Sequence, residues 1–289
     1  MKTLLASLLQ SYSLFQLFNV YGIGCSILLF FLYRWLWKQV QPSSVHWRKK
    51  LYLSLALGLL VLVKGTPIDL LGKHYFLSLH VMQLACIFFI VLPLLILSLP
   101  TRLLQNRIWH HRTRSIFRLV SHPWLSLVLF NGTLSLYLVP TVFTFLQSKP
   151  AIQMLYQGTL VILGACMWFV IIQPVQLFQR ENPLLRALYI FLASLFLLPI
   201  SFYLLIADTA FFPYYASRQA VFLPELHSLY DQQLAAGILK ISQMSSYALA
   251  LLTIVFTWSR KEREREGLVM EKHLRYVRGV VVHMEDRKK

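Results

Sequence analysis

Two polar segments stand at the starts of long apolar runs, and their side chains are chemically the most distinctive in the sequence. One is Asp231-Gln232-Gln233, and the other, residues 78–83, contains His80. Carrying a polar group into lipid is costly, so polar residues at such positions indicate a functional site. The sequence therefore predicts a site on one side of a membrane protein.

Helical spacing places further polar side chains on common faces. At about 100° per residue, His80 and Gln83 share one face of their helix. The other faces of this kind are Gln153, Tyr156 and Gln157 on a later helix, and Lys240, Gln243, Met244 and Tyr247 on the last helix, in line with Gln233. Three helices with these stripes turned inward would form a polar pocket.

Soft donor atoms accompany His80, and they belong to Met82, Cys86, Met154 and Met244. Imidazole together with thioether or thiolate favours a soft ion such as Cu(I) over Mg²⁺ or Ca²⁺. Methionine is also a common gap-filler in cores, and a lone histidine often hydrogen-bonds across helices. The residues alone leave a copper site and a packed polar core both open.

The usual enzymatic motifs do not occur. Cys25, Cys86 and Cys166 fall in apolar runs and indicate no disulfide framework. The His110-His111 pair lies among arginines, and there is no nucleophile elbow, phosphate-binding glycine loop or zincin helix. We therefore predict that the protein is not an enzyme.

The elements that position these residues must lie in a membrane. Of the 289 residues, 57% are apolar and 13% are charged, and the charged fraction is about half that of a soluble protein. At about 20 residues per crossing, the chain has room for seven spans. We predict an all-α polytopic helix bundle with spans at 17–36, 51–63, 75–99, 123–145, 151–172, 184–207 and 234–258.

Two features modify these spans. The 51–63 run is short, and we expect Lys50 and Lys64 to extend it by reaching to the two membrane surfaces. Pro93, Pro140 and Pro199 lie inside spans, where each removes a helix hydrogen bond and is expected to kink its helix.

The distribution of basic residues predicts the topology. Of the 28 Lys and Arg residues, five lie in 34–50, five in 102–118, two in 180–186 and ten in 260–289, while six fall elsewhere. These segments are alternate loops plus the C-terminal tail, so the N-terminus is predicted outside and the C-terminus in the cytoplasm. The net charge of +17 then favours anionic lipid as a partner, and no recognition module for nucleic acid accompanies it.

The chain divides into a seven-span membrane domain, residues 1–258, and a charged cytoplasmic tail, residues 259–289. The tail begins with residues of alternating charge, which support a helix that leaves the membrane. A solvated helical extension and a docking surface for a cytoplasmic partner are both compatible with this pattern.

Several of these motifs resemble those of the CtaG family, bacterial membrane proteins of about seven spans that assist cytochrome c oxidase assembly and are linked to copper supply. The resemblance covers about 65–258. Residues 78–83 are similar to the family's Ser-x-His-Met-x-Gln helix, with the Met displaced by one position. The further matches are Pro93-Leu94-Leu95, His122-Pro123 and Asp231-Gln232-Gln233-Leu234-Ala235.

The sequence departs from the family at three histidines. Leu84 follows Gln83 where many members have a second His, Leu138 replaces the His of a Trp-His-x-Pro motif, and Gln157 stands where a His is common. A multi-histidine copper site therefore does not carry over, and His80 alone transfers directly.

The resemblance implies an assembly factor, or chaperone, for a haem–copper oxidase of the respiratory chain, which assists copper delivery to the catalytic subunit from the extracytoplasmic side. His80 would be the copper ligand, with Met82, Met154 and Met244 as weaker donors. The polar rim would be Gln83, Gln157, Asp231, Gln232 and Gln233. Oxidase subunits would be the partners, the bacterial cell membrane the location, and homo-oligomers are possible. The alternatives are a small transporter or permease and a metal-free assembly scaffold.

Overall fold

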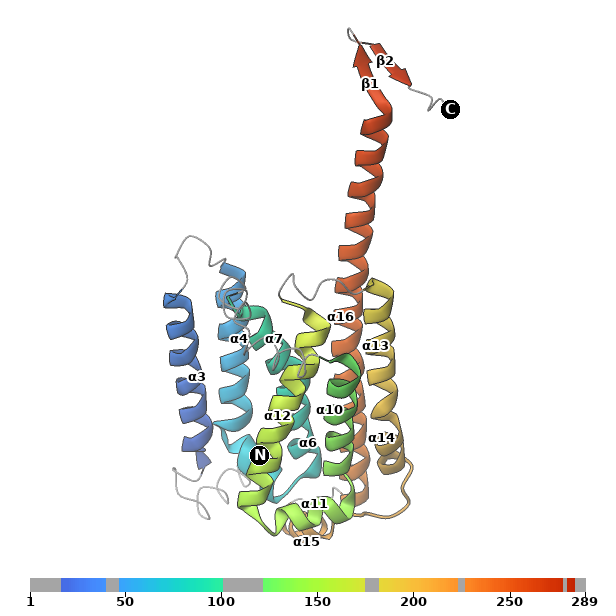
Figure 1. Ribbon diagram of the computed structural model, residues 1–289. Helices are drawn as coiled ribbons and strands as arrows, with labels where there is room; N and C mark the ends of the chain where they lie inside the picture. The colour runs from blue at the N-terminus through green and yellow to red at the C-terminus, as the bar shows by residue number, and fades with distance from the viewer. Residues whose placement is uncertain are drawn as a thin grey trace.

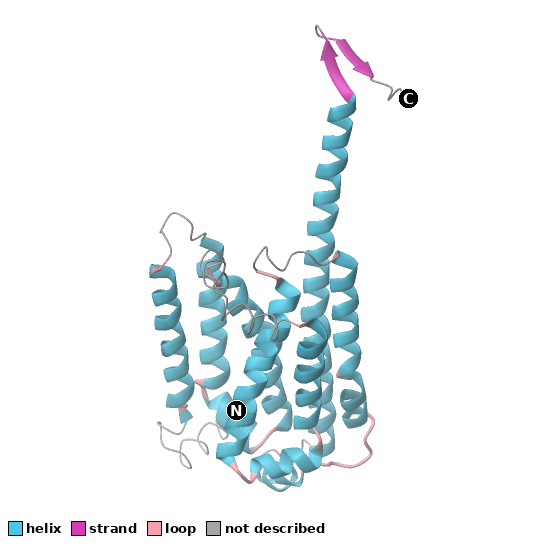
Figure 2. Cartoon of the chain, viewed as in Figure 1, coloured by secondary structure: helices cyan, strands magenta, loops and turns pink. Residues whose placement is uncertain are grey.

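The protein is a bundle of helices from which one long helix projects (Figure 1). The computed structural model describes residues 17–39, 47–100, 122–174, 182–222, 227–277 and 280–283. These segments are helical apart from connections and one short hairpin (Figure 2). The predicted all-α class is therefore confirmed. Of the predicted features, the basic segment 102–118 with its His110-His111 pair and residues 284–289 of the tail lie outside the described residues.

The helices agree closely with the predicted spans. In chain order they are α3 (Val20–Lys38), α4 (Trp47–Lys64), α5 (Pro67–His74), α6 (Leu77–Cys86), the π-helix η2 (Ile87–Val91), α7 (Leu92–Ser98), α10 (Pro123–Tyr137), α11 (Pro140–Gln147), α12 (Pro150–Ile172), α13 (Pro183–Phe196), α14 (Leu198–Leu205), α15 (Pro213–Phe222) and α16 (Ser228–His273). Within the described ranges, five helices are long and apolar enough to cross a membrane, or seven if each of two bent pairs is one span.

The span predicted at 123–145 consists of two helices, and the break between them lies at the kink predicted for Pro140. The chain breaks after Tyr137, and α11 leaves α10 at 74°. Pro140 lacks a backbone N–H and disfavours helical geometry in the residue before it, and Val139 is extended accordingly. The break places α11 at the end of the bundle beside α15 (Figure 1).

Pro93 distorts its span in a different way, because the helix runs on through the π-helical turn η2. Pro93 has no N–H to offer the carbonyls of Phe88 and Phe89, its partners in π- and α-helical geometry. Trp168 Nε1 donates to the Phe88 carbonyl at 2.7 Å, and the Ser246 hydroxyl donates to that of Phe89. Both vacated carbonyls are therefore paired with neighbouring helices, as a membrane interior requires.

The apolar core lies between α6, η2, α10, α12 and α16. Phe88, Phe130 and Trp168 are among its largest fully buried side chains. At the end of the bundle that holds α11, α15 and the start of α16, the core gives way to polar side chains. We call this the outer end, because the charge pattern predicts that it faces outside; the opposite end, where α16 leaves the bundle, is the inner end.

Beyond the inner end, α16 continues well past its neighbours and leads into a hairpin (Figure 1). The hairpin pairs β1 (Leu274–Val277) with β2 (Val280–His283) in antiparallel register. Arg260 and Glu264 form an exposed (i, i+4) ion pair at 3.5 Å along the extension, as the alternating charges predict. The helical start expected for the tail is thus present.

Candidate functional site: a polar core at the outer end

Asp231 fixes the start of the helix that carries His80. Its carboxylate accepts hydrogen bonds from the backbone N–H of Leu77 at 2.7 Å and of Ser78 at 3.2 Å, and from the Ser78 hydroxyl. The first N–H groups of a helix have no partner within it, and a carboxylate there also suits the helix dipole. Asp231 therefore caps α6 from a helix more than 150 positions away in the sequence.

The two glutamines after Asp231 hold the connection between α14 and α15. The Gln232 side chain accepts from the N–H of Phe211 at 2.7 Å and donates to the carbonyl of Leu204 at 3.3 Å. Gln233 donates to the carbonyl of Ala207 at 3.3 Å. The triplet thus ties α6 and this connection to the start of α16.

The hydroxyl of Tyr137 is the centre of a buried network. It lies 2.9 Å from His80 Nε2, and it accepts hydrogen bonds from the amides of Gln157 at 3.0 Å and Gln153 at 3.3 Å. Because two donors occupy the lone pairs of this oxygen, its own proton goes to His80 Nε2. The imidazole therefore carries its proton on Nδ1, and this buried nitrogen has no hydrogen-bond partner in the part of the chain that the structure describes.

The network continues to α15. Gln153 donates to the Gln147 side-chain oxygen at 3.0 Å, Gln147 donates to the Tyr215 hydroxyl at 3.3 Å, and Tyr215 donates to the Gly72 carbonyl at 3.0 Å. We call these groups the tyrosine network: His80, Tyr137, Gln147, Gln153, Gln157 and Tyr215. It joins α6, α10, α11, α12, α15 and the backbone of α5.

A second cluster lies beside the tyrosine network, where α5 packs on α6, and its centre is a carboxylate. Asp69 is 2% exposed. It is bonded to Lys64 at 3.1 Å, Lys73 at 2.6 Å and the Asn19 amide at 2.7 Å. Gln83 accepts from Lys64 at 3.3 Å and donates to the Ile68 carbonyl at 2.8 Å. We call Asn19, Lys64, Asp69, Lys73 and Gln83 the charged cluster.

This cluster corrects the expectation for Lys64. Its ammonium does not extend to the membrane surface but turns inward to Asp69, and the side chain is only 17% exposed. A buried carboxylate needs a paired cation, and this pairing outweighs the hydration that Lys64 would gain at the surface.

Gly72 lets the two clusters approach each other. A Cβ atom at this position would lie 2.9 Å from Gln83 Nε2 and 3.0 Å from the backbone nitrogen of His80. Only a residue without a side chain allows α5 to pack this closely on α6. His80 and Gln83 share a buried face of α6, as the spacing predicts, but each side chain belongs to a different cluster.

The polar stripe of the last helix does not join this site, and the predicted three-helix pocket is wrong in that respect. Lys240 donates to the Ser194 carbonyl at 2.6 Å, and Gln243 donates to that of Ala193 at 3.1 Å. These carbonyls belong to the last turn of α13, which ends before Pro199 and leaves them without helical partners. An ammonium also suits the negative end of a helix.

The predicted sulfur donors are not assembled around His80. Met154 is 76% exposed and Met244 is 56% exposed on the outside of the bundle, whereas His80 is 1% exposed. Met82 is half-buried on α6. Among the described residues, no three His, Cys, Asp or Glu side chains are grouped so that they could hold a metal ion. The geometry thus offers His80 as a single donor, and its Nε2 lone pair accepts from Tyr137.

Two functional features were missed in the sequence. A tyrosine inside an apolar span, such as Tyr137, looks like an ordinary core aromatic, and nothing in its neighbours signals a hydrogen-bond centre. The charged cluster did leave a signal, because Asp69 and Lys73 are four residues apart near the end of a span. An acidic residue there implies a cation close by.

The fold and the site define a polytopic membrane protein with a polar core at one end. The chain matches the family described as cytochrome c oxidase caa3 assembly factor (Caa3_CtaG) over residues 28–261. This match covers most of the chain, so the protein belongs to that family. No curated protein and no solved structure is significantly similar to it.

Proposed function

We propose that the protein assists assembly of a caa3-type cytochrome c oxidase as a scaffold in the bacterial cell membrane, without a catalytic step of its own. The family match, which extends from α3 into α16, carries this proposal. The arrangement of the outer end supports it, because the Asp231 cap and the two clusters rigidly connect the surface formed by α5, α11 and α15. A rigid outer surface suits contact with an oxidase subunit during assembly.

Copper delivery to the catalytic subunit from the outer side is the second candidate, and one observation favours it. His80 is a fully buried imidazole whose Nδ1–H has no partner among the described residues, and leaving a buried donor unpaired is costly. A protonated nitrogen cannot bind a metal ion, so Nε2 would be the ligand atom. Copper would be the cargo and His80 its nitrogen donor. The Tyr137 hydroxyl now donates to Nε2, so removal of this hydroxyl distinguishes copper delivery from a scaffold.

The test is complementation of a deletion strain with the wild type and with His80→Ala, Tyr137→Phe and Cys166→Ala. Oxidase activity, oxidase copper content and the abundance of each variant are measured. A scaffold predicts that activity falls together with stability: Tyr137→Phe removes three hydrogen bonds of about 0.6 kcal/mol each and should be at least as damaging as His80→Ala, which removes one, and added copper should rescue neither. Copper delivery predicts that His80→Ala loses activity and oxidase copper at normal abundance, while Tyr137→Phe keeps them.

Cys166→Ala is the control, because Cys166 lies on α12 about two and a half turns from Gln157, away from the site. A deletion strain with full oxidase activity would refute both candidates. If that strain also lost uptake of a solute, the transporter alternative would hold.

The side of the membrane needs its own measurement. Reporters fused after Lys149 and near Arg218 are expected to read as extracytoplasmic, and fusions after Arg114 or at the tail as cytoplasmic. A cytoplasmic signal near Arg218 would place the polar core on the inner side and remove delivery from outside.

A further inference from the structure

The inner half of the bundle has a groove that the proposed function does not use. Its volume is about 560 Å³. Its walls come from η2 and α7, from the C-terminal turns of α12, from the first turn of α13 and from the middle of α16. Ile90 and Leu249 on its walls are 41% and 67% exposed, so the groove opens toward lipid.

The packing around Pro93 shapes this groove. Trp168 and Ser246 turn inward and donate to the carbonyls of Phe88 and Phe89 beside Pro93, and Trp168, Ser246 and Pro93 all line the groove. Small side chains on α16, among them Ser242 and Ala250, leave the space open. The lining is apolar or weakly polar with one exception.

The exception is Arg186, the charged residue among those that line the groove. It lies in the first turn of α13 and donates from its guanidinium to the carbonyl of Ile171, at the end of α12. This contact fixes the positive charge at the inner end of an apolar groove. Arg186 belongs to the 180–186 segment that the charge pattern predicts at the cytoplasmic boundary, where basic residues attract the head groups of anionic lipids.

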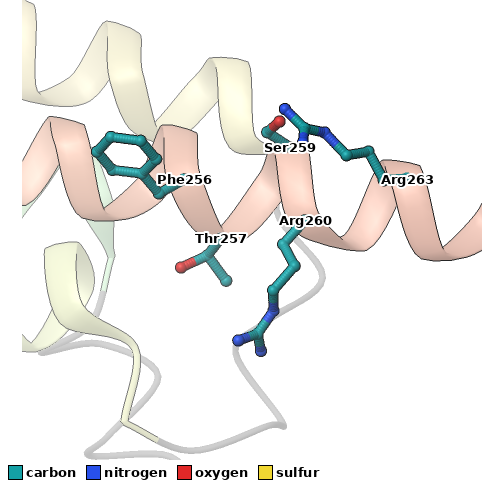
Figure 3. Close-up of a pocket in the computed structure, with 5 residues that line it drawn as sticks. All are labelled: Phe256, Thr257, Ser259, Arg260 and Arg263. Atoms are coloured by element: carbon teal, nitrogen blue, oxygen red, sulfur yellow. The ribbon is translucent and has the colours of Figure 1, made fainter.

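More positive charge lies close by along α16. A second pocket, of about 480 Å³, is lined by Phe256, Thr257, Ser259, Arg260 and Arg263. Figure 3 shows Arg260 extending on the side of Thr257, while Arg263 lies beside Ser259. These residues follow Ile254, the last α16 residue of the groove, along the same helix, so basic side chains lie on α16 beyond the inner end of the groove.

We propose that the groove binds one anionic phospholipid, with an acyl chain along α7 and α16 and its phosphate at Arg186. The occupant must combine an apolar chain with a negative group, and the anionic lipids of a cytoplasmic leaflet do so. A transmembrane helix fits less well for two reasons. Its diameter is about 10–12 Å, whereas the volume of the groove is typical of a small-ligand site, and its apolar side chains would lie against a guanidinium.

The test uses the full-length protein in nanodiscs or mild detergent. Native mass spectrometry would count bound phosphatidylglycerol and phosphatidylcholine with identical acyl chains. The wild type is expected to retain one phosphatidylglycerol in preference to phosphatidylcholine, and Arg186→Gln to reduce that retention about fivefold, as for the loss of one basic residue near a membrane surface. Arg218→Gln, an exposed arginine at the other end of the bundle, is the charge control and should change nothing.

A second variant fills the groove without touching the charge. Ser245→Phe should displace the lipid, whereas Ile162→Phe, on an exposed face of α12 outside the groove, should not. Comparison of Ser245→Phe with Ile162→Phe tests the lipid site even if Arg186→Gln fails to fold. Equal retention of the two lipids by the wild type, or no effect of Ser245→Phe, would overturn the proposal. A photo-crosslinker at Ser245 that captures a polypeptide in cells instead of lipid would do so as well.

Discussion

The charged cluster and the tyrosine network are neighbours on one face of α6, and they hold it by different means. In the charged cluster, one carboxylate is surrounded by two ammonium groups and an amide. In the tyrosine network, neutral groups form a chain around one hydroxyl. The first depends on charge balance and the second on geometry. Removal of a charged partner leaves an unpaired ion in the interior, whereas removal of a neutral partner leaves an unpaired polar group. We therefore expect substitutions in the charged cluster to lower the stability much more.

The two clusters also differ in how completely their central polar groups are paired. Both carboxylate oxygens of Asp69 have partners. His80 has one nitrogen in the network and one without a partner. We infer that the charged cluster holds α5 and α6 together, while the tyrosine network is the part of the polar core that can respond to a partner or to copper.

The largest effect is expected for Asp69→Ala. It leaves Lys64 buried without its counter-ion, and breaking a buried pair costs about 3–5 kcal/mol. Thermal unfolding of the purified protein in detergent should show a large drop in stability. Asp208→Ala, a change of the same type at an exposed aspartate, is the control. A loss no larger than that of the control would mean that Asp69 does not organise the cluster.

A smaller effect is expected for Asp231→Ala, which removes the cap of α6. Loss of a capping side chain costs about 0.5–2 kcal/mol, with further loss because buried N–H groups stay unpaired. Because the cap positions the helix that carries His80, oxidase assembly should decline together with stability. Gln233→Ala removes a single bond of 3.3 Å and should cost less. Equal losses for the two variants would contradict the capping role.

The next prediction concerns the contact between the clusters. Gly72→Ala forces its new methyl group against the backbone nitrogen of His80, which cannot move like the end of a side chain. Overpacking of this kind costs about 1–3 kcal/mol. Gly158→Ala is the matched control, since nothing lies within 4 Å of a Cβ atom there. A stable Gly72→Ala protein would show that α5 can shift away from α6.

Much of this fold could be predicted from the sequence, because lipid imposes simple rules on span length and on the placement of Lys and Arg. The Asp231 segment was found for the same reason: a polar residue at the start of a span is conspicuous. What it does there could not be predicted. Its partners, the N–H groups of Leu77 and Ser78, are backbone groups on a distant helix, and only the fold brings them together.

The last helix shows what helical periodicity cannot predict. Helical spacing correctly places Lys240 and Gln243 on one stripe, but it does not say which neighbour the stripe meets. The acceptors exist because α13 ends at Phe196 and leaves its last carbonyls unpaired. Pro199 was recognised as a kink, yet the consequence of that kink for a different helix depends on the packing of the whole bundle.

The smallest effect is expected for Lys73→Ala, which tests whether contact length or burial decides the strength of an ion pair in the charged cluster. Lys73 lies closer to Asp69 than Lys64 does, at 2.6 Å against 3.1 Å, but its side chain is 47% exposed against 17%. Solvent screens the exposed pair, so Lys73→Ala should cost well under about 1 kcal/mol.

Lys64→Ala should cost clearly more, because it also removes the bond to Gln83 from a nearly dry site. Unfolding of the two single variants and the double variant measures the coupling. If Lys73→Ala lowered the stability more than Lys64→Ala, contact length would matter more than burial. The charged cluster would then be centred on the exposed pair of Asp69 and Lys73.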